Sequence, residues 1–112
     1  MRPTPGPGAV GAAGAAVTRR TGAVLSRSEV EAALRADGLT PHSWSNGAGV
    51  LYAPHAHQYR KVLYCVTGSI VFHTDDGDMA LGPGDRLELA PGVEHAATVG
   101  NAGVQCVEAP VT

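Results

Sequence analysis

The sequence predicts an all-β domain, an antiparallel sandwich or barrel, with one short N-terminal helix and a disordered N-terminal tail. From residue 40 onward, apolar stretches of strand length follow one another, separated by turns rich in glycine, proline and aspartate. This pattern is typical of small all-β folds. Only one earlier stretch has helical spacing, and alanine, glycine and proline dominate the residues before it. The chain of 112 residues is long enough for one domain and no more.

Residues 1–26 form a tail that we expect to be disordered. Its small side chains cannot bury enough apolar surface to offset the entropy lost on ordering. Residues 1–27 carry four arginines and no acid, whereas residues 28–112 carry four basic and ten acidic residues, a formal balance of −6 (four minus ten). An acidic domain without a basic cluster argues against a nucleic-acid partner. No run approaches the roughly 20 apolar residues of a membrane span, so we expect no membrane partner.

The predicted helix lies within residues 27–39. Ser28 and Glu31 have the spacing of a capping box, in which the serine side chain accepts from a first-turn amide and the glutamate reaches back. The apolar residues that follow recur at helical spacing and predict a helix over about residues 29–37. Gly38 is a natural C-terminal stop.

The barrel is expected to occupy residues 40–112. Turn residues such as Asn46-Gly47 and Pro91-Gly92 separate its strands. The apolar run at residues 62–66 predicts a strand buried on both faces, one inside the barrel and one against a partner or second sheet. The predicted strands are His42–Ser45, Val50–Tyr52, His55–His57, Lys61–Val66, Ile70–His73, Met79–Leu81, Arg86–Leu89, Ala96–Val99 and Val104–Glu108.

Three histidines have the spacing of a metal site. His55 and His57 are two residues apart, so on an extended strand both side chains point the same way. His95 follows a Pro-Gly turn and can arrive from a neighbouring strand. Three imidazoles converging in this way form a nitrogen face with open positions for chemistry or ligand binding. The alternative is that the imidazoles are structural and hydrogen-bonded within the barrel.

Two stretches of the chain resemble the motifs of the cupin superfamily. Gly49-Val-Leu-Tyr-Ala-Pro-His55-Ala-His57-Gln-Tyr-Arg-Lys61-Val-Leu-Tyr-Cys-Val-Thr-Gly68 is similar to the first motif, in which His-x-His follows a glycine and a glutamate comes next. Gly84-Asp-Arg-Leu-Glu-Leu-Ala-Pro-Gly-Val-Glu-His95 looks like the second. The resemblance, to small single-domain cupins of type-2-like sequence, covers about residues 40–109. It implies a small antiparallel jelly-roll barrel (RmlC-like) with a metal or ligand pocket inside.

The resemblance also implies a ligand set. In typical members three histidines and the glutamate hold one divalent metal, and the histidines correspond to His55, His57 and His95. The glutamate position holds Lys61 instead. Three interpretations stay open: Lys61 is neutral beside a metal, it turns away from the cation and contacts a substrate anion, or no metal binds and the pocket takes an anion. A fourth is that Lys61 reaches the rim and is solvated. Glu94 is expected to point away from the site.

The two cysteines, Cys65 and Cys106, lie within predicted strands. Because no other feature indicates secretion, we expect buried free thiols and a cytoplasmic protein. A domain of this size buries a modest fraction of its surface and often gains stability by pairing with a copy of itself, so we expect a homodimer.

These observations lead to three hypotheses about function. The first is a single-domain cupin that binds one divalent transition metal (Fe, Mn, Ni, Zn or Cu) through the three histidines. As an enzyme it would be dioxygenase-like and act on a small anionic substrate, with Lys61 contacting the anion. The second is a non-enzymatic cupin that binds a small anionic molecule, with or without metal. The third is a metal-free isomerase-type cupin that uses histidine and lysine as acid and base.

Overall fold

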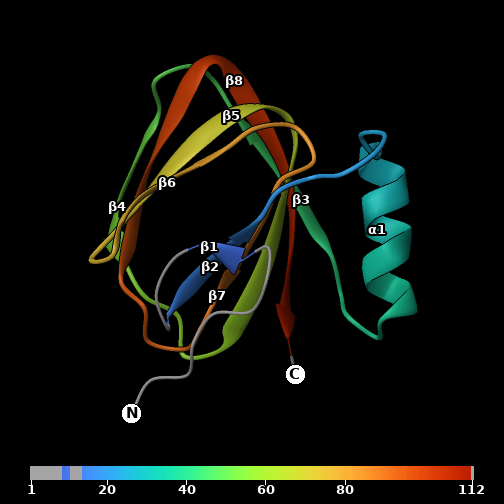
Figure 1. The fold of residues 1–112 in the computed structure, drawn as a ribbon, viewed down its shortest axis with the longest axis horizontal. Helices are drawn as coiled ribbons and strands as arrows, with labels where there is room; N and C mark the ends of the chain where they lie inside the picture. Colours follow the sequence, from blue (N-terminus) through green and yellow to red (C-terminus); the bar gives the residue numbers. More distant parts are fainter. Residues whose placement is uncertain (1–8, 11–13, 112) are drawn as a thin grey trace.

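A computed structural model describes residues 9–10 and 14–111, and these form an antiparallel β-barrel with one helix packed on its outside (Figure 1). The predicted all-β fold, a small barrel of the jelly-roll kind, is confirmed. The helix is too short and too polar to cross a membrane, and the described residues contain no other helix. The elements are β1 (Ala9–Val10), β2 (Ala15–Thr18), α1 (Arg27–Ala36), β3 (His42–Asn46), β4 (Leu51–His55), β5 (Arg60–Thr74), β6 (Gly77–Leu81), β7 (Arg86–Leu89) and β8 (His95–Val111).

Two long strands, β5 and β8, pair antiparallel along most of their length and take part in both walls of the barrel. The first half of β5 and the second half of β8 lie in one wall, in the order β1-β2-β7-β5-β8-β3. The other halves form the second wall, where β6 pairs with β5 and β4 pairs with β8. The barrel therefore consists of two half-sheets that share their two central strands.

Each of these strands spans a turn-like sequence that we expected to separate two strands. Thr67-Gly68 bends β5 and does not end it, because β8 continues the ladder on both sides with register shifts at the bend. Gly68 has φ of 75°, and a Cβ at this position would collide with the carbonyl oxygen of Gly103. Glycine is needed here because the two backbones approach so closely.

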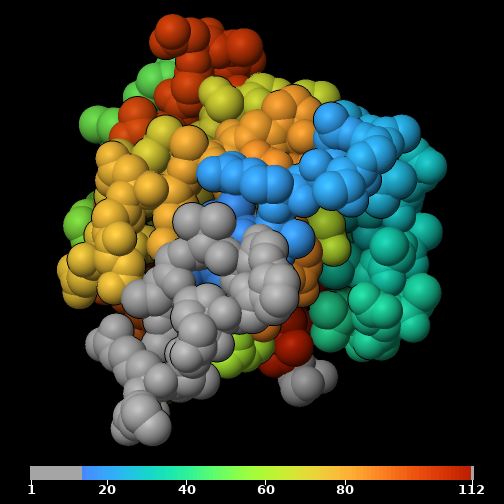
Figure 2. All heavy atoms as spheres, in the orientation of Figure 1, coloured from blue at the N-terminus to red at the C-terminus, as the bar shows by residue number. Residues whose placement is uncertain are grey.

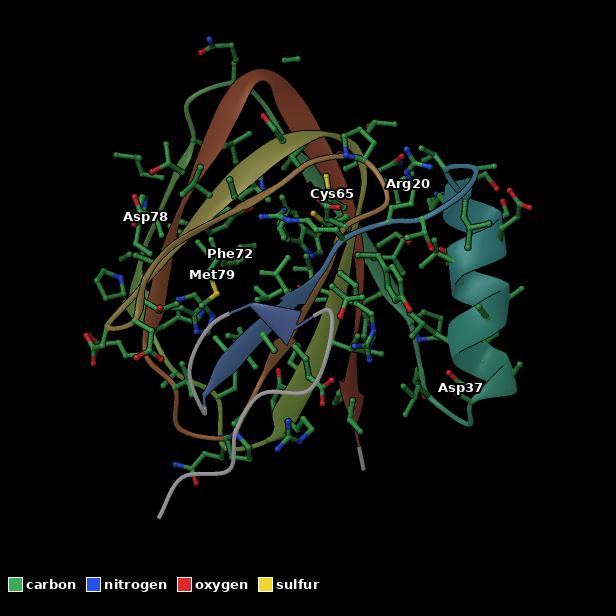
Figure 3. All side chains as sticks on the ribbon, in the orientation of Figure 1. Arg20, Asp37, Cys65, Phe72, Asp78 and Met79 are labelled. Atoms are coloured by element: carbon green, nitrogen blue, oxygen red, sulfur yellow. The ribbon has the colours of Figure 1, made fainter. Side chains whose placement is uncertain are left out.

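The core has two parts. Inside the barrel, buried side chains from both walls meet, and Figure 3 shows Phe72 and Met79 among them. Between the barrel and α1, Val30 and Leu34 of the helix pack on Val62 and other apolar residues of β5 and β8. The strand at residues 62–66 is therefore buried on both faces as predicted, but α1 covers the outer face rather than a partner or a second sheet.

The helix begins two residues earlier than the sequence predicts. Ser26, not Ser28, is the N-cap: its Oγ accepts from the amide of Glu29 at 3.2 Å, and the Glu29 carboxylate accepts from the Ser26 amide at 2.9 Å. Both serines precede a glutamate by three residues, so the capping pattern alone does not choose between them. Gly38, with φ of 82°, follows the helix end as expected.

The expectation that residues 1–26 are disordered is wrong for residues 9–10, which form β1, and for residues 14–26. Ala15–Thr18 forms β2, which pairs with β7 and buries Ala15 and Val17 in the barrel core. Arg19 then binds Asp85 through a Nη1–Oδ2 contact of 2.9 Å. The segment gains order because the open edge of β7 supplies backbone partners and an existing core. Figure 2 shows it crossing the barrel towards α1. Residues 1–8 and 11–13 lie outside the described residues.

Candidate metal-binding site

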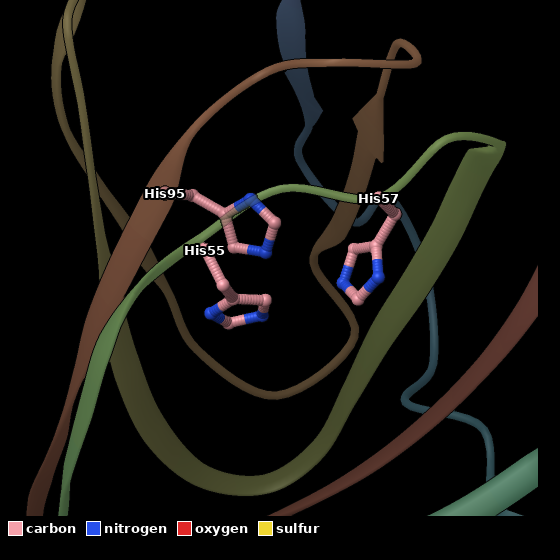
Figure 4. A group of neighbouring side chains, drawn as sticks. All are labelled: His55, His57 and His95. Atoms are coloured by element: carbon pink, nitrogen blue, oxygen red, sulfur yellow. The ribbon is translucent and has the colours of Figure 1, made fainter.

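The three predicted histidines converge inside one end of the barrel (Figure 4). Each offers one ring nitrogen, and these nitrogens all lie within 4.8 Å of one another. His55 ends β4 and stands opposite His95, the first residue of β8. His57 lies beyond the end of β4, so strand alternation is not what aligns it with His55. Its loop is instead tied to the Pro-Gly turn, where the Gly92 amide donates to the His57 carbonyl oxygen at 2.7 Å.

Backbone carbonyls select the tautomer of two of these rings. The Nδ1 atoms of His55 and His95 lie 2.9 Å and 3.0 Å from the carbonyl oxygens of Ala53 and Val93. A carbonyl oxygen only accepts, so each Nδ1 donates and carries the proton of the neutral ring. The Nε2 atoms then keep a free lone pair, as a metal ligand requires.

Two of the Nε2 atoms are also buried without a hydrogen-bond partner. Among the described residues, neither Nε2 of His57 nor Nε2 of His95 has a hydrogen-bond partner. A buried polar nitrogen left without a partner costs free energy, and this site holds two. A divalent cation satisfies both at once, so the donor set fits a metal of the kind that imidazole ligates.

The pKa values of His57 and His95 also favour metal binding. Burial lowers the pKa of His95 and His57, and the neighbouring Lys61 ammonium lowers both further. For His95 the hydrogen bond to the Val93 carbonyl opposes these effects without reversing them. The imidazoles of His57 and His95 are therefore held in the neutral form that can ligate a metal.

The three rings line a cavity of about 380 Å³ whose remaining wall includes three aromatic side chains. Trp44 and Tyr52 meet edge to face with ring centroids 5.7 Å apart, and Phe72 lies 6.2 Å from the His95 ring. The cavity is large enough for a small organic molecule. Its lining residues are Trp44, Asn46, Tyr52, His55, His57, Lys61, Phe72, His95, Ala97 and Glu108.

Lys61 lies in this cavity and is buried, with 6% of its surface exposed. The interpretation that it reaches the rim and is solvated is therefore wrong. Its Nζ is 3.2 Å from Oε2 of Glu108, and the other carboxylate oxygen of Glu108 accepts from Nε1 of Trp44 at 2.7 Å. The ammonium thus has a carboxylate partner within the pocket.

Sequence reasoning missed Glu108. It lies near the end of β8, outside the two motifs, and its role depends on strand pairing that the motifs do not report. One signal was available in the sequence. The stretch from Val104 to Val111 is apolar except for Gln105 and Glu108, and Glu108 is its single charged residue. A charge within a largely buried stretch of strand needs a partner.

The other predicted residues lie outside the pocket. Glu94 is exposed and does not line the cavity, as expected. Cys65 and Cys106 stand opposite each other on β5 and β8, and both are free and buried in the barrel core, which confirms the expected thiols.

Solved structures similar to this chain include cupins. A cupin superfamily protein from Desulfitobacterium hafniense DCB-2 matches with a TM-score of 0.59 and 18% identity, over 65% of this chain and 66% of that one. An RmlC-like cupin from Shewanella frigidimarina NCIMB 400 matches with a TM-score of 0.57 and 24% identity, over 66% and 67%. A DMSP lyase from Ruegeria pomeroyi DSS-3 matches with a TM-score of 0.61 and 21% identity, over 66% of this chain but 38% of the lyase.

These identities are low, so the matches show a shared fold. The chain spans about two thirds of the first two structures and less than half of the lyase. No curated protein matches the sequence. A family model described as a cupin domain matches residues 43–108, more than half of the chain and all of the site described above. The barrel, its histidine-lined cavity and this match together place the chain in the cupin family.

Proposed function

We propose that this protein binds one divalent transition metal through the Nε2 atoms of His55, His57 and His95 and presents it to a small anionic molecule in the cavity. The observation that supports the proposal most strongly is the pair of buried Nε2 atoms, on His57 and His95, that have no partner among the described residues. The hydrogen bonds from Nδ1 of His55 and His95 orient two of the rings for this role.

The protein's own side chains define what the cavity can accept. The aromatic side chains of Trp44, Tyr52 and Phe72 in the cavity lining favour a ligand with an apolar body. Lys61 supplies a positive group, and an ammonium has three donors, so its contact with Glu108 leaves others for a ligand anion such as a carboxylate or enolate. When bound, the metal would supply Lewis acidity and, as iron, redox chemistry with dioxygen.

The metal claim is tested by elemental analysis of the purified protein beside a His55→Ala/His57→Ala double variant. We expect near-stoichiometric metal in the native protein and its loss in the double variant. His42→Ala is the matched control, because His42 is exposed on β3 and does not line the cavity. A native protein that arrives without metal and cannot be loaded with iron, zinc, nickel, copper or manganese would refute the proposal.

We further propose that the protein is an enzyme of the dioxygenase-like class. Three neutral ligands leave a bound metal its full positive charge, which favours an anionic substrate on the metal beside Lys61. Oxygen uptake by the iron-loaded protein, measured with diketones, phenols and thiols, tests this class. If none of these substrates consumes oxygen while the metal stays bound, the dioxygenase proposal fails for those classes.

The second candidate function is binding of a small anion without catalysis. The buried Lys61 favours it, because its ammonium, held by Glu108, can contact an anion without any metal. Equilibrium dialysis with a set of small carboxylates, with and without a chelator, separates the two. Binding that survives the chelator and is lost in Lys61→Met favours the metal-free pocket. Binding that the chelator abolishes favours the metal.

A further inference from the structure

We propose that Glu108 is a positioning residue that lets Lys61 share one pocket with a bound divalent cation. The inference rests on the metal site proposed above and concerns how the chain tolerates a lysine beside it. An uncompensated ammonium among the three imidazoles would repel a dication, whereas a Lys61–Glu108 ion pair has no net charge.

The register of β5, β8 and β3 places Lys61, Glu108 and Trp44 on one face of the sheet. Glu108 on β8 stands opposite Leu63 on β5, and Lys61 is two residues from Leu63 and so shares its side. On the other neighbour of β8, Glu108 stands opposite His42 of β3, and Trp44 is two residues further along. Three adjacent strands therefore direct Lys61, Glu108 and Trp44 into the same cavity.

Both oxygens of the Glu108 carboxylate are held. Trp44 donates to Oε1 at 2.7 Å, and the Lys61 ammonium lies 3.2 Å from Oε2. The Lys61 side chain is 8% exposed and that of Glu108 is 21% exposed, so water screens the pair only partly. A carboxylate fixed at both oxygens keeps the ammonium in one place and supplies its counter-charge there.

The consequence is a specific dependence of metal affinity on charge. Removing the Glu108 charge leaves the buried Lys61 ammonium without its counter-charge in the pocket of the three histidines. At an effective dielectric of about 20, one unit charge in the same pocket as a dication changes the metal affinity by roughly tenfold or more. Removing the Lys61 charge leaves a net negative group and strengthens binding. Removing both restores a neutral pocket.

The test is a Co²⁺ titration of the metal-free protein, followed by visible absorption and by competition with a chelator. We expect Glu108→Gln to bind Co²⁺ at least about tenfold more weakly than the native protein and Lys61→Gln to bind it more tightly. The double variant should return to within about threefold of the native affinity. Glu88→Gln is the matched control, because it removes one negative charge from the surface Arg60–Glu88 pair, away from the cavity.

Three results would overturn the inference, and the first two of them leave the metal site in place. The first is an unchanged affinity in Glu108→Gln. The second is an equal loss in Glu108→Gln and in the double variant, which means that Glu108 acts on the metal without reference to Lys61. The third is binding by Lys61→Gln but not by the native protein, which means that Glu108 does not compensate the lysine.

Absence of Co²⁺ binding in every variant would refute both the inference and the proposed function. If Glu108→Gln does not fold, Lys61→Gln and the double variant still differ only in the Glu108 charge. A Co²⁺ affinity of the double variant that lies within about threefold of the native value and below that of Lys61→Gln then supports the inference. Equal affinities in the double variant and Lys61→Gln overturn it.

Discussion

At the scale of single residues, the properties of the pocket depend on which ring nitrogen carries a proton. The carbonyl oxygens of Ala53 and Val93 each accept from an Nδ1, so in the neutral rings of His55 and His95 it is Nε2 that carries the free lone pair. Burial, reinforced by Lys61, lowers the pKa of His57 and His95, so these rings resist the proton that would abolish metal binding. The same residues that favour a metal therefore make the metal-free protein sensitive to acid.

We predict that the metal-free protein loses stability as the pH falls below 6.5, the ordinary histidine pKa. Because the folded-state pKa of His95 and His57 is lowered, the unfolded chain binds more protons in this range, and unfolding becomes easier. The loss of stability begins near pH 6.5 and is complete below the folded-state pKa values of the two histidines. Above pH 6.5 both rings are neutral in the folded and the unfolded chain, so they add nothing to the pH dependence of stability. Urea unfolding between pH 8 and pH 5 measures it.

The control for this prediction is His95→Gln, which removes one of the two rings whose pKa is lowered. Its overall stability is expected to differ from that of the native protein, but the readout is the slope of the unfolding free energy against pH. A slope no shallower than that of the native protein would show that the His95 ring does not titrate as its surroundings imply.

At the scale of the elements, the sequence pattern located most strands and misjudged how they join. Arg86–Leu89 is predicted with its observed bounds, because strand length and flanking turns are local features. The expected breaks at Thr67-Gly68 and near Gly103 are bends within β5 and β8, because each bend is held by pairing with the other strand. β2 was missed because its small side chains become apolar core only when the edge of β7 is present.

The N-terminal strand should contribute to stability. We predict that Val17→Ala lowers the free energy of unfolding by roughly 1–3 kcal/mol, because the lost methyl groups leave a cavity in the barrel core. Val17 is fully buried, whereas Val24 in the same segment is 44% exposed, so Val24→Ala is the matched control and should change little. Thermal or urea denaturation measures both. Equal, negligible effects would mean that the segment is not packed on the barrel in solution.

At the scale of the whole molecule, the two half-sheets leave one aromatic-walled cavity next to the histidines, while α1 covers the opposite side of β5. A barrel of this size buries only a small core, and pairing with a second copy would remove further apolar surface from water and add stability. Leu51 on β4, with 73% of its surface exposed, is the most exposed of the large apolar side chains in the described residues.

Homodimer formation stays a prediction. Sedimentation equilibrium should give a mass of twice the 11.4 kDa of one chain. The mass should fall towards one chain on dilution if the pairing is weak. A mass of one chain at every concentration would contradict the prediction, and it would mean that the barrel and α1 alone bury enough surface to be stable.

The sequence by itself determined the fold class, the short helix and the three histidines, because strand alternation, turn residues and motif spacing are properties of neighbouring residues. It also pointed to Lys61. Only the tertiary structure decided that Lys61 is paired with Glu108, that Trp44 holds the same carboxylate from 64 residues away, and that two Nε2 atoms are buried without a partner. These facts depend on the register of β3 and β5 against β8, and long-range register is set by packing of the whole barrel rather than by any local pattern.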